Sequence, residues 1–203
     1  MQIPDNFSRD MHNALQTQRH YVVRGLLTPE EFPSWSDFAW AMEDAAHRNT
    51  ETRSGNPFKE RQINDLFIFG LLYCYIFLNE NDRETYFKKL LPVQGLLRET
   101  FPREIRTFNM ATAFMNLITG DGFADSHNDV MTHNFYVQLE GQTEWSLRTD
   151  RQIEAEIDRI VLNPGDAIFV PNLLFHAVKA QTPRTAMVFR LDLEDGPYDH
   201  DVS

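Results

Sequence analysis

A turn, a short apolar run and a histidine follow one another near the end of the chain. The stretch reads Asn163-Pro164-Gly165-Asp166-Ala167-Ile168-Phe169-Val170-Pro171, and His176 follows five residues after the second proline. Pro, Gly and Asp in succession are strong turn signals. The apolar run 167–170 between two prolines therefore predicts a short strand that begins at a turn.

A second stretch, His127-Asn128-Asp129, lies upstream of this one. Side chains two positions apart on an extended strand point to the same face, so His127 and Asp129 are expected to lie side by side. His176, arriving from a distant strand, would complete a set of two histidines and one carboxylate. Such a set leaves metal positions open and is typical of non-haem Fe(II) oxygenases. The alternatives are a purely structural trio of side chains and a barrel that has lost its metal.

The sequence from residue 107 onward alternates short β-like runs with turn signals. The turns are predicted at 120–122, 140–141, 164–166 and 182–183. The expected strands lie in residues 107–118, 135–139, 144–147, 159–162, 167–170, 175–180 and 185–193. Many short strands at regular turn spacing indicate a sandwich or a barrel.

The first hundred residues are predicted to be mostly helical. Thr28-Pro29-Glu30-Glu31 has the capping-box pattern of a helix start. The expected elements are a helix in 5–20, a strand at 21–23, a helix from 28 to 46 that is interrupted or restarts near Pro33, a loop at 49–59, a helix or core strand at 66–78, a turn at 79–83 and a helix at 84–99. We predict a single domain over residues 1–203, with 1–106 as mostly helical support, 107–193 as the β core and 194–203 as an acidic tail.

Composition narrows the class of protein. The chain has 203 residues, of which 42% are hydrophobic and sixteen are Phe, as expected for a folded globular protein. Its net charge of −11 disfavours a nucleic-acid partner. The single cysteine, Cys74, is compatible with a reducing compartment. No signal-peptide pattern is present at the start, and the longest apolar run is too short to span a bilayer, so a cytoplasmic protein without a membrane partner is expected.

Three parts of the sequence resemble one superfamily. The stretch from Asn163 to Pro171 with His176 resembles the second motif of cupin and Jumonji-type proteins, and His127-Asn128-Asp129 resembles their first two metal ligands. Residues 134–141, followed by Trp145, resemble the strand-turn-strand of Jumonji-type oxygenases. The resemblance covers roughly residues 107–193. It implies a mainly β fold with N-terminal helices, namely a double-stranded β-helix (a jelly-roll or cupin-like barrel).

The resemblance also implies a cofactor set. In this superfamily His127, Asp129 and His176 would hold Fe(II), while 2-oxoglutarate and O2 would be cosubstrates. Jumonji-type enzymes place a Lys for the far carboxylate of 2-oxoglutarate soon after the position of Gly141, and Gln142-Thr143-Glu144 offers none. One of the two arginines on the last strand, Arg184 or Arg190, takes its place in our prediction. They are six residues apart and so share a face, and a guanidinium binds carboxylate in a bidentate manner.

Asn116 resembles the strand Asn that assists the same carboxylate in some 2-oxoglutarate oxygenases, and Asn134 is a further candidate for cofactor binding. Both, like Tyr136, are equally compatible with ordinary sheet positions.

The predicted function is an Fe(II)- and 2-oxoglutarate-dependent dioxygenase. It would hydroxylate a small-molecule or amino-acid-like substrate and release succinate and CO2. One alternative is a cupin-type metalloenzyme without 2-oxoglutarate, in which His133 is a fourth ligand; another is a non-catalytic β-helix binding module. The sequence assigns no oligomeric state.

Overall fold

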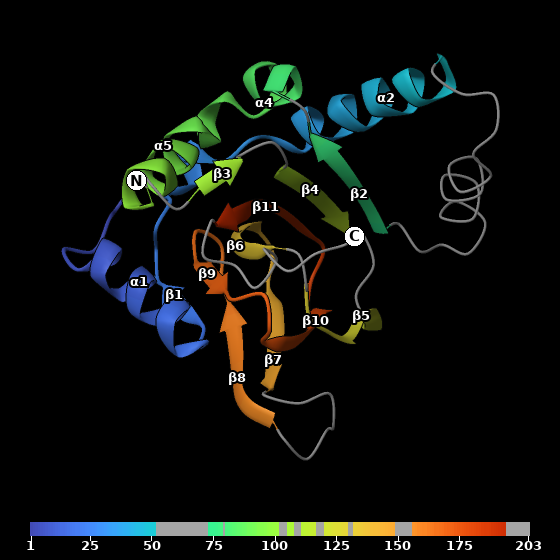
Figure 1. The fold of residues 1–203 in the computed structure, drawn as a ribbon. Helices are drawn as coiled ribbons and strands as arrows, with labels where there is room; N and C mark the ends of the chain where they lie inside the picture. Colours follow the sequence, from blue (N-terminus) through green and yellow to red (C-terminus); the bar gives the residue numbers. More distant parts are fainter. Residues whose placement is uncertain are drawn as a thin grey trace, which may run out of the picture.

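The computed structural model describes residues 1–51, 73–78, 80–101, 105–107, 111–116, 120–129, 132–148 and 156–193. Its helices come first along the chain, and most of its strands follow (Figure 1). The helical elements are α1 (Phe7–Thr17), η1 (Pro29–Glu31), α2 (Trp35–Glu51), α4 (Glu80–Tyr86), η2 (Lys88–Leu90) and α5 (Leu91–Thr100). The strands are β1 (Tyr21–Val23), β2 (Tyr73–Leu78), β3 (Ile105–Thr107), β4 (Ala111–Asn116), β5 (Gly120–His127), β6 (His133–Glu140), β7 (Thr143–Arg148), β8 (Glu156–Leu162), β9 (Ala167–Val170), β10 (Phe175–Ala180) and β11 (Arg184–Leu193).

Within the described residues the strands form two antiparallel sheets. The larger has seven strands in the order β1-β9-β6-β11-β4-β2, with β3 pairing to β11. The smaller has four strands in the order β5-β10-β7-β8. Neighbours in each sheet are mostly distant along the chain, as in β6 beside β11 and β5 beside β10. This pairing is the jelly-roll arrangement that the sequence predicted.

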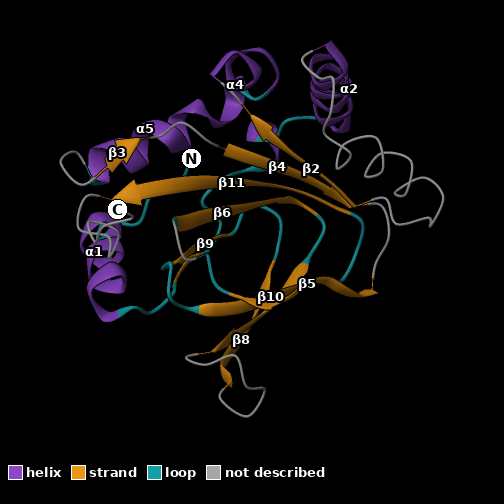
Figure 2. Ribbon diagram, turned by 45° about the vertical axis from the view of Figure 1, so that its right-hand side comes forward, coloured by secondary structure: helices purple, strands orange, loops and turns teal. Residues whose placement is uncertain are grey.

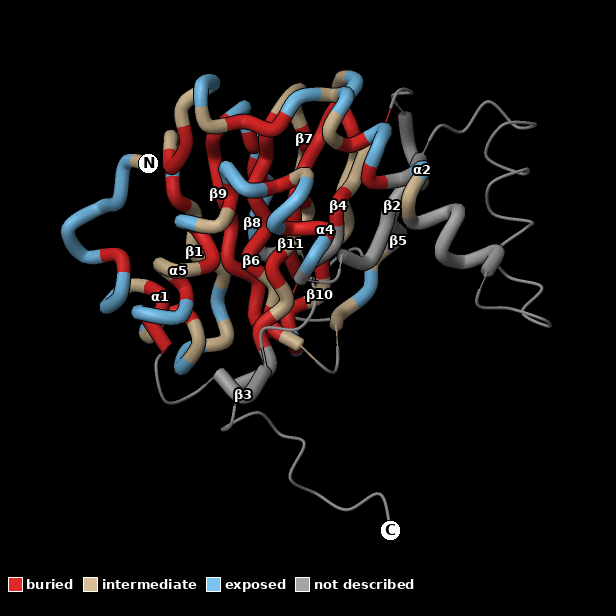
Figure 3. Tube along the Cα trace, turned by 90° about the horizontal axis from the view of Figure 1, so that it is seen from above, coloured by how far each residue is buried: buried red, intermediate tan, exposed pale blue. Residues whose placement is uncertain are grey.

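The helices cover one face of the larger sheet, and the smaller sheet lies against the other face (Figure 2). Two apolar clusters fill the two interfaces. The first joins residues of α1, α2 and α5 to one face of β6, β9 and β11, and includes Phe7, Phe38 and Leu97. The second lies between the sheets and includes Trp145, Leu147, Ile168 and Ala186. Buried residues are accordingly concentrated in the central strands (Figure 3).

Strands β6 and β11 serve both interfaces because their side chains alternate. Phe135 and Val137 of β6 belong to the cluster under the helices, whereas Tyr136 belongs to the cluster between the sheets. On β11, Met187 and Phe189 face the helices and Ala186 faces the smaller sheet. The even-numbered residues of both strands therefore point to the inside of the barrel.

The Gly-Asp turn before β9 is fixed by contacts with residues 24–27 and by a hydrogen bond within the turn itself. Gly165 has φ +88°, and a Cβ at this position would lie 2.2 Å from the Leu27 carbonyl oxygen, so a side chain would be excluded. The Asp166 carboxylate accepts hydrogen bonds from Arg24 Nη1 at 2.6 Å and from the Gly25 and Asn163 backbone N–H groups at 2.9 Å. The turn thereby ties β9 to the segment after β1.

Most expected elements agree with the structure. β1, β9 and β10 match their predicted limits, and the capping box at Thr28 is present. The helix predicted from residue 28 ends as η1 and restarts as α2, where the side chains of Ser34 and Asp37 make a second capping interaction. Of the ambiguous run 66–78, the part 73–78 is strand β2, and residues 66–72 lie outside the described residues.

Two predicted turns are wrong. Residues 80–83, expected in a turn, begin helix α4, whose last turn carries Arg83. Residues 120–122, expected as a glycine turn, begin strand β5, because pairing to β10 sets Gly120 opposite Ala180. Most of the predicted loop 49–59 and the acidic tail lie outside the described residues. No helix in the described parts of the chain is long and apolar enough to cross a membrane.

Candidate metal centre

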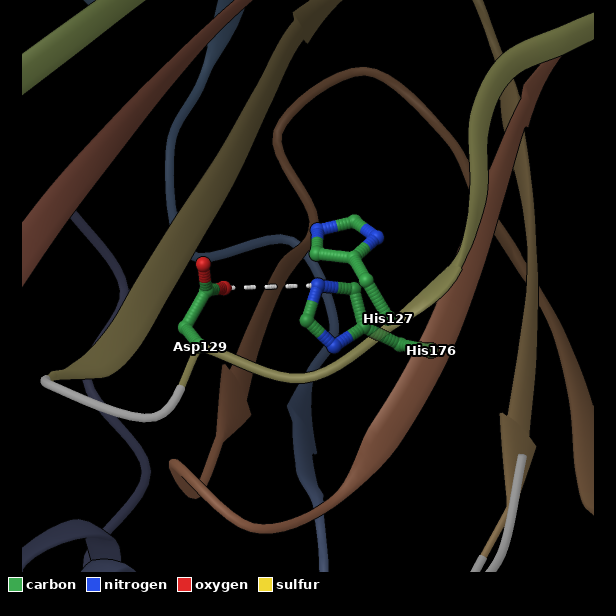
Figure 4. A group of neighbouring side chains, drawn as sticks. All are labelled: His127, Asp129 and His176. Atoms are coloured by element: carbon green, nitrogen blue, oxygen red, sulfur yellow. Dashed lines mark ion pairs between the residues drawn. The ribbon is translucent and has the colours of Figure 1, made fainter.

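His127, Asp129 and His176 lie close together, and the two histidines come from neighbouring strands of the smaller sheet (Figure 4). His127 is the last residue of β5 and pairs across the smaller sheet with His176, the second residue of β10. Asp129 lies two residues beyond His127, past the end of the strand, so the strand alternation expected for this pair does not extend to it. One ligand atom from each residue lies within 4.8 Å of the others.

The three side chains are oriented towards one another. His176 Nε2 lies 3.5 Å from Asp129 Oδ2, and the two imidazole rings are 4.4 Å apart between centroids. Exposure falls from His127, which is exposed, through the half-buried Asp129 to His176, which is only 5% exposed. The group is therefore open to solvent on the His127 side.

The hydrogen bonding of His176 leaves one nitrogen for a cation. Its Nδ1 lies 3.2 Å from the Leu174 carbonyl oxygen, which can only accept, so Nδ1 carries the proton. Burial lowers the pKa of His176, as does the neighbouring His127, and together these outweigh the opposite effect of Asp129 and the Leu174 carbonyl. The neutral ring then directs the Nε2 lone pair at a carboxylate oxygen. Two acceptors facing each other fit a divalent metal ion between them.

Trp145 supports His176 from inside the barrel. Its ring stacks on the imidazole at 5.6 Å with an interplanar angle of 26°. Trp145 also meets Tyr136 edge to face at 4.9 Å, and its Nε1 donates to Thr143 Oγ1 at 3.1 Å. These contacts fix the ring of a buried ligand, which reduces the entropy lost when a metal binds.

Arg184 is a buried cation at the start of β11, only 3% exposed. Its Nε donates to Asn116 Oδ1 and its Nη1 to the Tyr136 hydroxyl, both at 2.5 Å. Its guanidinium carbon also lies 5.9 Å from the ring centres of Phe114 and Tyr136. Among the described residues, no carboxylate pairs with this charge. A buried cation with only neutral partners is costly unless an anion joins it.

Asn116 adds an unused donor beside this cation. Its Oδ1 accepts from Arg184, while its buried Nδ2 has no hydrogen-bond partner among the described residues. An orphaned buried N–H group is unfavourable in the empty protein and would be satisfied by an acceptor. Arg184 and Asn116 together therefore fit the carboxylate of a ligand.

Tyr136 belongs to a hydrogen-bond network that the sequence did not reveal. The Tyr136 hydroxyl donates to Gln138 Oε1 at 2.8 Å, and Thr143 Oγ1 donates to the same oxygen at 3.0 Å. Gln138 Nε2 in turn donates to the Glu140 carbonyl at 2.6 Å. Burial raises the pKa of Tyr136 more than the neighbouring Arg184 lowers it, so the hydroxyl stays protonated. The only sequence signal for this network was that residues 134, 136 and 138 alternate along one strand and so share a face.

The other predicted residues lie elsewhere. Arg190 shares the inner face with Arg184, but it is half-buried and its guanidinium contacts Thr132 Oγ1 at 3.3–3.4 Å. Asn134, predicted to bind a cofactor, donates from Nδ2 to Asp129 Oδ2. His133 lies on the opposite face of β6, where it stacks on Phe169 and its Nδ1 accepts from the Asn172 backbone N–H at 3.2 Å. This position takes it away from the three predicted ligands.

Comparison with solved structures finds the same fold. The chain is similar to a ribosomal oxygenase from Escherichia coli, YcfD, in complex with cobalt and 2-oxoglutarate: the TM-score is 0.60 at 16% identity over 94% of this chain and 52% of that one. A second structure of YcfD gives a TM-score of 0.59 at 13% identity, again over 94% and 52%. The chain thus spans about half the length of these relatives. No family model and no curated protein matches its sequence.

These similarities show the architecture. The chain has the double-stranded β-helix fold that the motif resemblance predicted, with two antiparallel sheets and helices on one face of the larger one. The side chains inside the barrel, and not the fold, determine what it binds, because one fold supports many activities.

Proposed function

We propose that this chain is an Fe(II)- and 2-oxoglutarate-dependent oxygenase that hydroxylates a small-molecule or amino-acid-like substrate. One observation carries the proposal: a buried Arg184 without a carboxylate partner among the described residues lies on the inner face of a barrel that also carries His127, Asp129 and His176. A metal site alone would fit many enzymes. The metal site together with a buried anion pocket fits a metal-chelating carboxylic acid that reaches from one to the other.

In this proposal the protein binds and orients, and the iron with 2-oxoglutarate supplies the oxidising chemistry when bound. His127, Asp129 and His176 would hold the metal and leave positions open on it. Arg184 would pair with the far carboxylate of 2-oxoglutarate in a bidentate manner, and Asn116 Nδ2 would donate a further hydrogen bond to it. Trp145 and Tyr136, which contact each other, line the interior between His176 and Arg184.

The alternative cupin-type enzyme receives less support. It required His133 as a fourth ligand, and His133 lies on the helix side of β6 against Phe169. It also leaves the buried charge of Arg184 unexplained. A non-catalytic binding module would need neither the metal ligands nor an anion pocket.

The substrate class rests on the surroundings of the site. The metal group opens to solvent at His127, so a substrate would enter there. The net charge of −11 disfavours a polyphosphate substrate. The YcfD structures are those of a ribosomal oxygenase about twice as long as this chain, and a macromolecular substrate of that kind is an outcome that substrate screening would reveal.

The direct test is the conversion of 2-oxoglutarate. Purified protein is supplied with Fe(II), 2-oxoglutarate and O2, and succinate is quantified with and without candidate substrates. We expect iron-dependent succinate, formed slowly without a substrate and faster with the correct one.

The matched control is Asp129→Ala, which removes the one anionic ligand of the set. We expect this variant to form no succinate above the iron-only background. Succinate formation by Asp129→Ala at the wild-type rate would refute the ligand assignment. Metal binding by the wild type without any use of 2-oxoglutarate would instead favour the cupin-type enzyme.

A further inference from the structure

Asn134 touches a predicted metal ligand. It is the second residue of β6 and belongs to the inner face, where its register partners are Val170 on β9 and Arg190 on β11. Its side-chain amide Nδ2 donates a hydrogen bond to Asp129 Oδ2. This contact differs from the cofactor contact that the sequence suggested.

The backbone at Asp129 does little to orient the carboxylate. Strand β5 ends at His127, so no ladder hydrogen bond of that strand holds Asp129. Its carbonyl oxygen accepts from the Thr132 backbone N–H at 3.2 Å, which closes a turn but leaves the side-chain torsions free. A half-buried carboxylate on such a turn would sample several rotamers.

Asn134 selects one carboxylate oxygen. The oxygen that accepts from Asn134 is Oδ2, the same atom that lies 3.5 Å from His176 Nε2. A carboxylate oxygen has two lone pairs, so it can accept from an amide and bind a metal together. A carboxylate that was free to rotate could chelate a metal through both oxygens and so occupy one more coordination position.

We infer that Asn134 is a positioning residue that fixes the Asp129 carboxylate to one-oxygen metal binding through Oδ2. This inference rests on the metal centre of the proposed function. Its consequence is that the open metal positions, which a chelating cosubstrate needs, depend on an amide from β6. The hydrogen bond to the binding oxygen also holds the side chain in place before the metal arrives.

Cobalt(II) binding to the metal-free protein tests the inference without turnover. Asn134→Leu keeps the approximate shape and removes the donor, and Asn134→Gln keeps an amide. Asn13→Leu on the exposed face of α1 is the matched control, because it makes the same chemical change away from the barrel. Titration calorimetry gives the affinity, and the visible absorption of bound cobalt reports its coordination number.

We expect Asn134→Leu to raise the Kd for cobalt by about tenfold, within the range seen for partners of metal ligands. Its visible bands should weaken, as they do when cobalt gains a ligand. Asn134→Gln should recover most of the affinity, and Asn13→Leu should match the wild type. Thermal unfolding of the metal-free variants checks that each is folded; if Asn134→Leu is not, Asn134→Ala takes its place with the same expected result.

The outcomes separate this inference from the proposed function. Wild-type affinity and wild-type bands in a folded donor-free variant would overturn the role of Asn134 and leave the metal centre standing. A wild-type protein that binds no cobalt would overturn both.

Discussion

The two faces of strand β6 have opposite chemistry although their residues alternate along one strand. On the helix side, Phe135, Val137 and Leu139 are fully buried in an apolar cluster. On the inner side, Asn134 donates a hydrogen bond to Asp129, while Tyr136 accepts one from Arg184 and donates one to Gln138. Strand β11 repeats the contrast, with Met187 and Phe189 on one side and Arg184 and Arg190 on the other.

We infer that the helix-side residues determine the stability of the fold and the inner-side residues determine ligand binding. The helix-side face gains free energy from apolar burial and needs no ligand. The inner face buries a charge and an unused amide donor, which cost free energy until a ligand joins them. Residues adjacent in sequence should therefore respond differently to substitution: one set should change unfolding, the other should change ligand binding.

The largest effect is expected at the metal ligands. His176→Ala should abolish metal binding, because it removes the buried nitrogen that faces Asp129. Titration calorimetry with Fe(II) under anaerobic conditions measures this, with the folded state of the variant checked by circular dichroism. Equal Fe(II) affinity in the variant and the wild type would show that the three side chains are a structural trio.

On the helix side, Phe135→Ala should lower the free energy of unfolding by about 3–5 kcal/mol, as large-to-small changes of buried aromatic residues do. Phe135 is 0% exposed and packs edge to face on Phe7 at 6.0 Å. Chemical denaturation measures the loss. If the variant still folds, its metal affinity should equal that of the wild type. A loss of metal affinity in a folded variant would show that the helix-side face also determines ligand binding.

On the inner side, Arg184→Met should raise the Kd for 2-oxoglutarate by roughly a hundredfold, which corresponds to about 3 kcal/mol. The ligand-free protein should change little in stability, because removal of the buried charge offsets the loss of its hydrogen bonds to Asn116 and Tyr136. Titrating 2-oxoglutarate into the Fe(II)-loaded protein measures the affinity.

Arg190→Met is the matched control for that experiment, since it makes the same change on the same face of β11. It should alter the affinity little, and both variants should bind metal. A large loss in Arg190→Met with near-wild-type affinity in Arg184→Met would reverse the assignment.

The smallest expected effect is that of Tyr136→Phe. The change removes the hydroxyl that accepts from Arg184 and donates to Gln138, but keeps the ring that packs on Trp145. We expect about a tenfold weaker affinity for 2-oxoglutarate, from the loss of one hydrogen bond to a charged group. Unchanged affinity would mean that Asn116 alone is enough to orient the guanidinium.

Local signals were enough to predict much of this fold. The Pro-Gly-Asp turn and the apolar run after it located β9, and the same rules located β1 and β10 to the residue. The turn expected at 120–122 failed because pairing with β10 overrides the preference of glycine for turns. The start of helix α4, residues 80–83, was missed because short polar runs such as Glu80-Asn81-Asp82 carry no periodic apolar signal.

The sequence indicated which residues would lie near the candidate site better than it indicated which groups those residues contact. Spacing alone suggested that Arg184 and Arg190 share a face, and they do. It could not tell that Arg184 is buried against Asn116 while Arg190 is half-buried, since burial depends on strands distant in sequence. For the same reason the contact of Asn134 with Asp129, which forms beyond the end of β5, required the tertiary structure.

On this proposal the inner face of the barrel holds a metal ion and 2-oxoglutarate together. Anaerobic addition of Fe(II) and then 2-oxoglutarate tests it in one cuvette, because chelation of Fe(II) by the keto acid gives a visible metal-to-ligand charge-transfer band. We predict that the band appears with the wild type, saturates at one iron per chain and is absent with His176→Ala. A wild-type protein that binds Fe(II) but develops no band at saturating 2-oxoglutarate would show that the metal and 2-oxoglutarate do not bind there together.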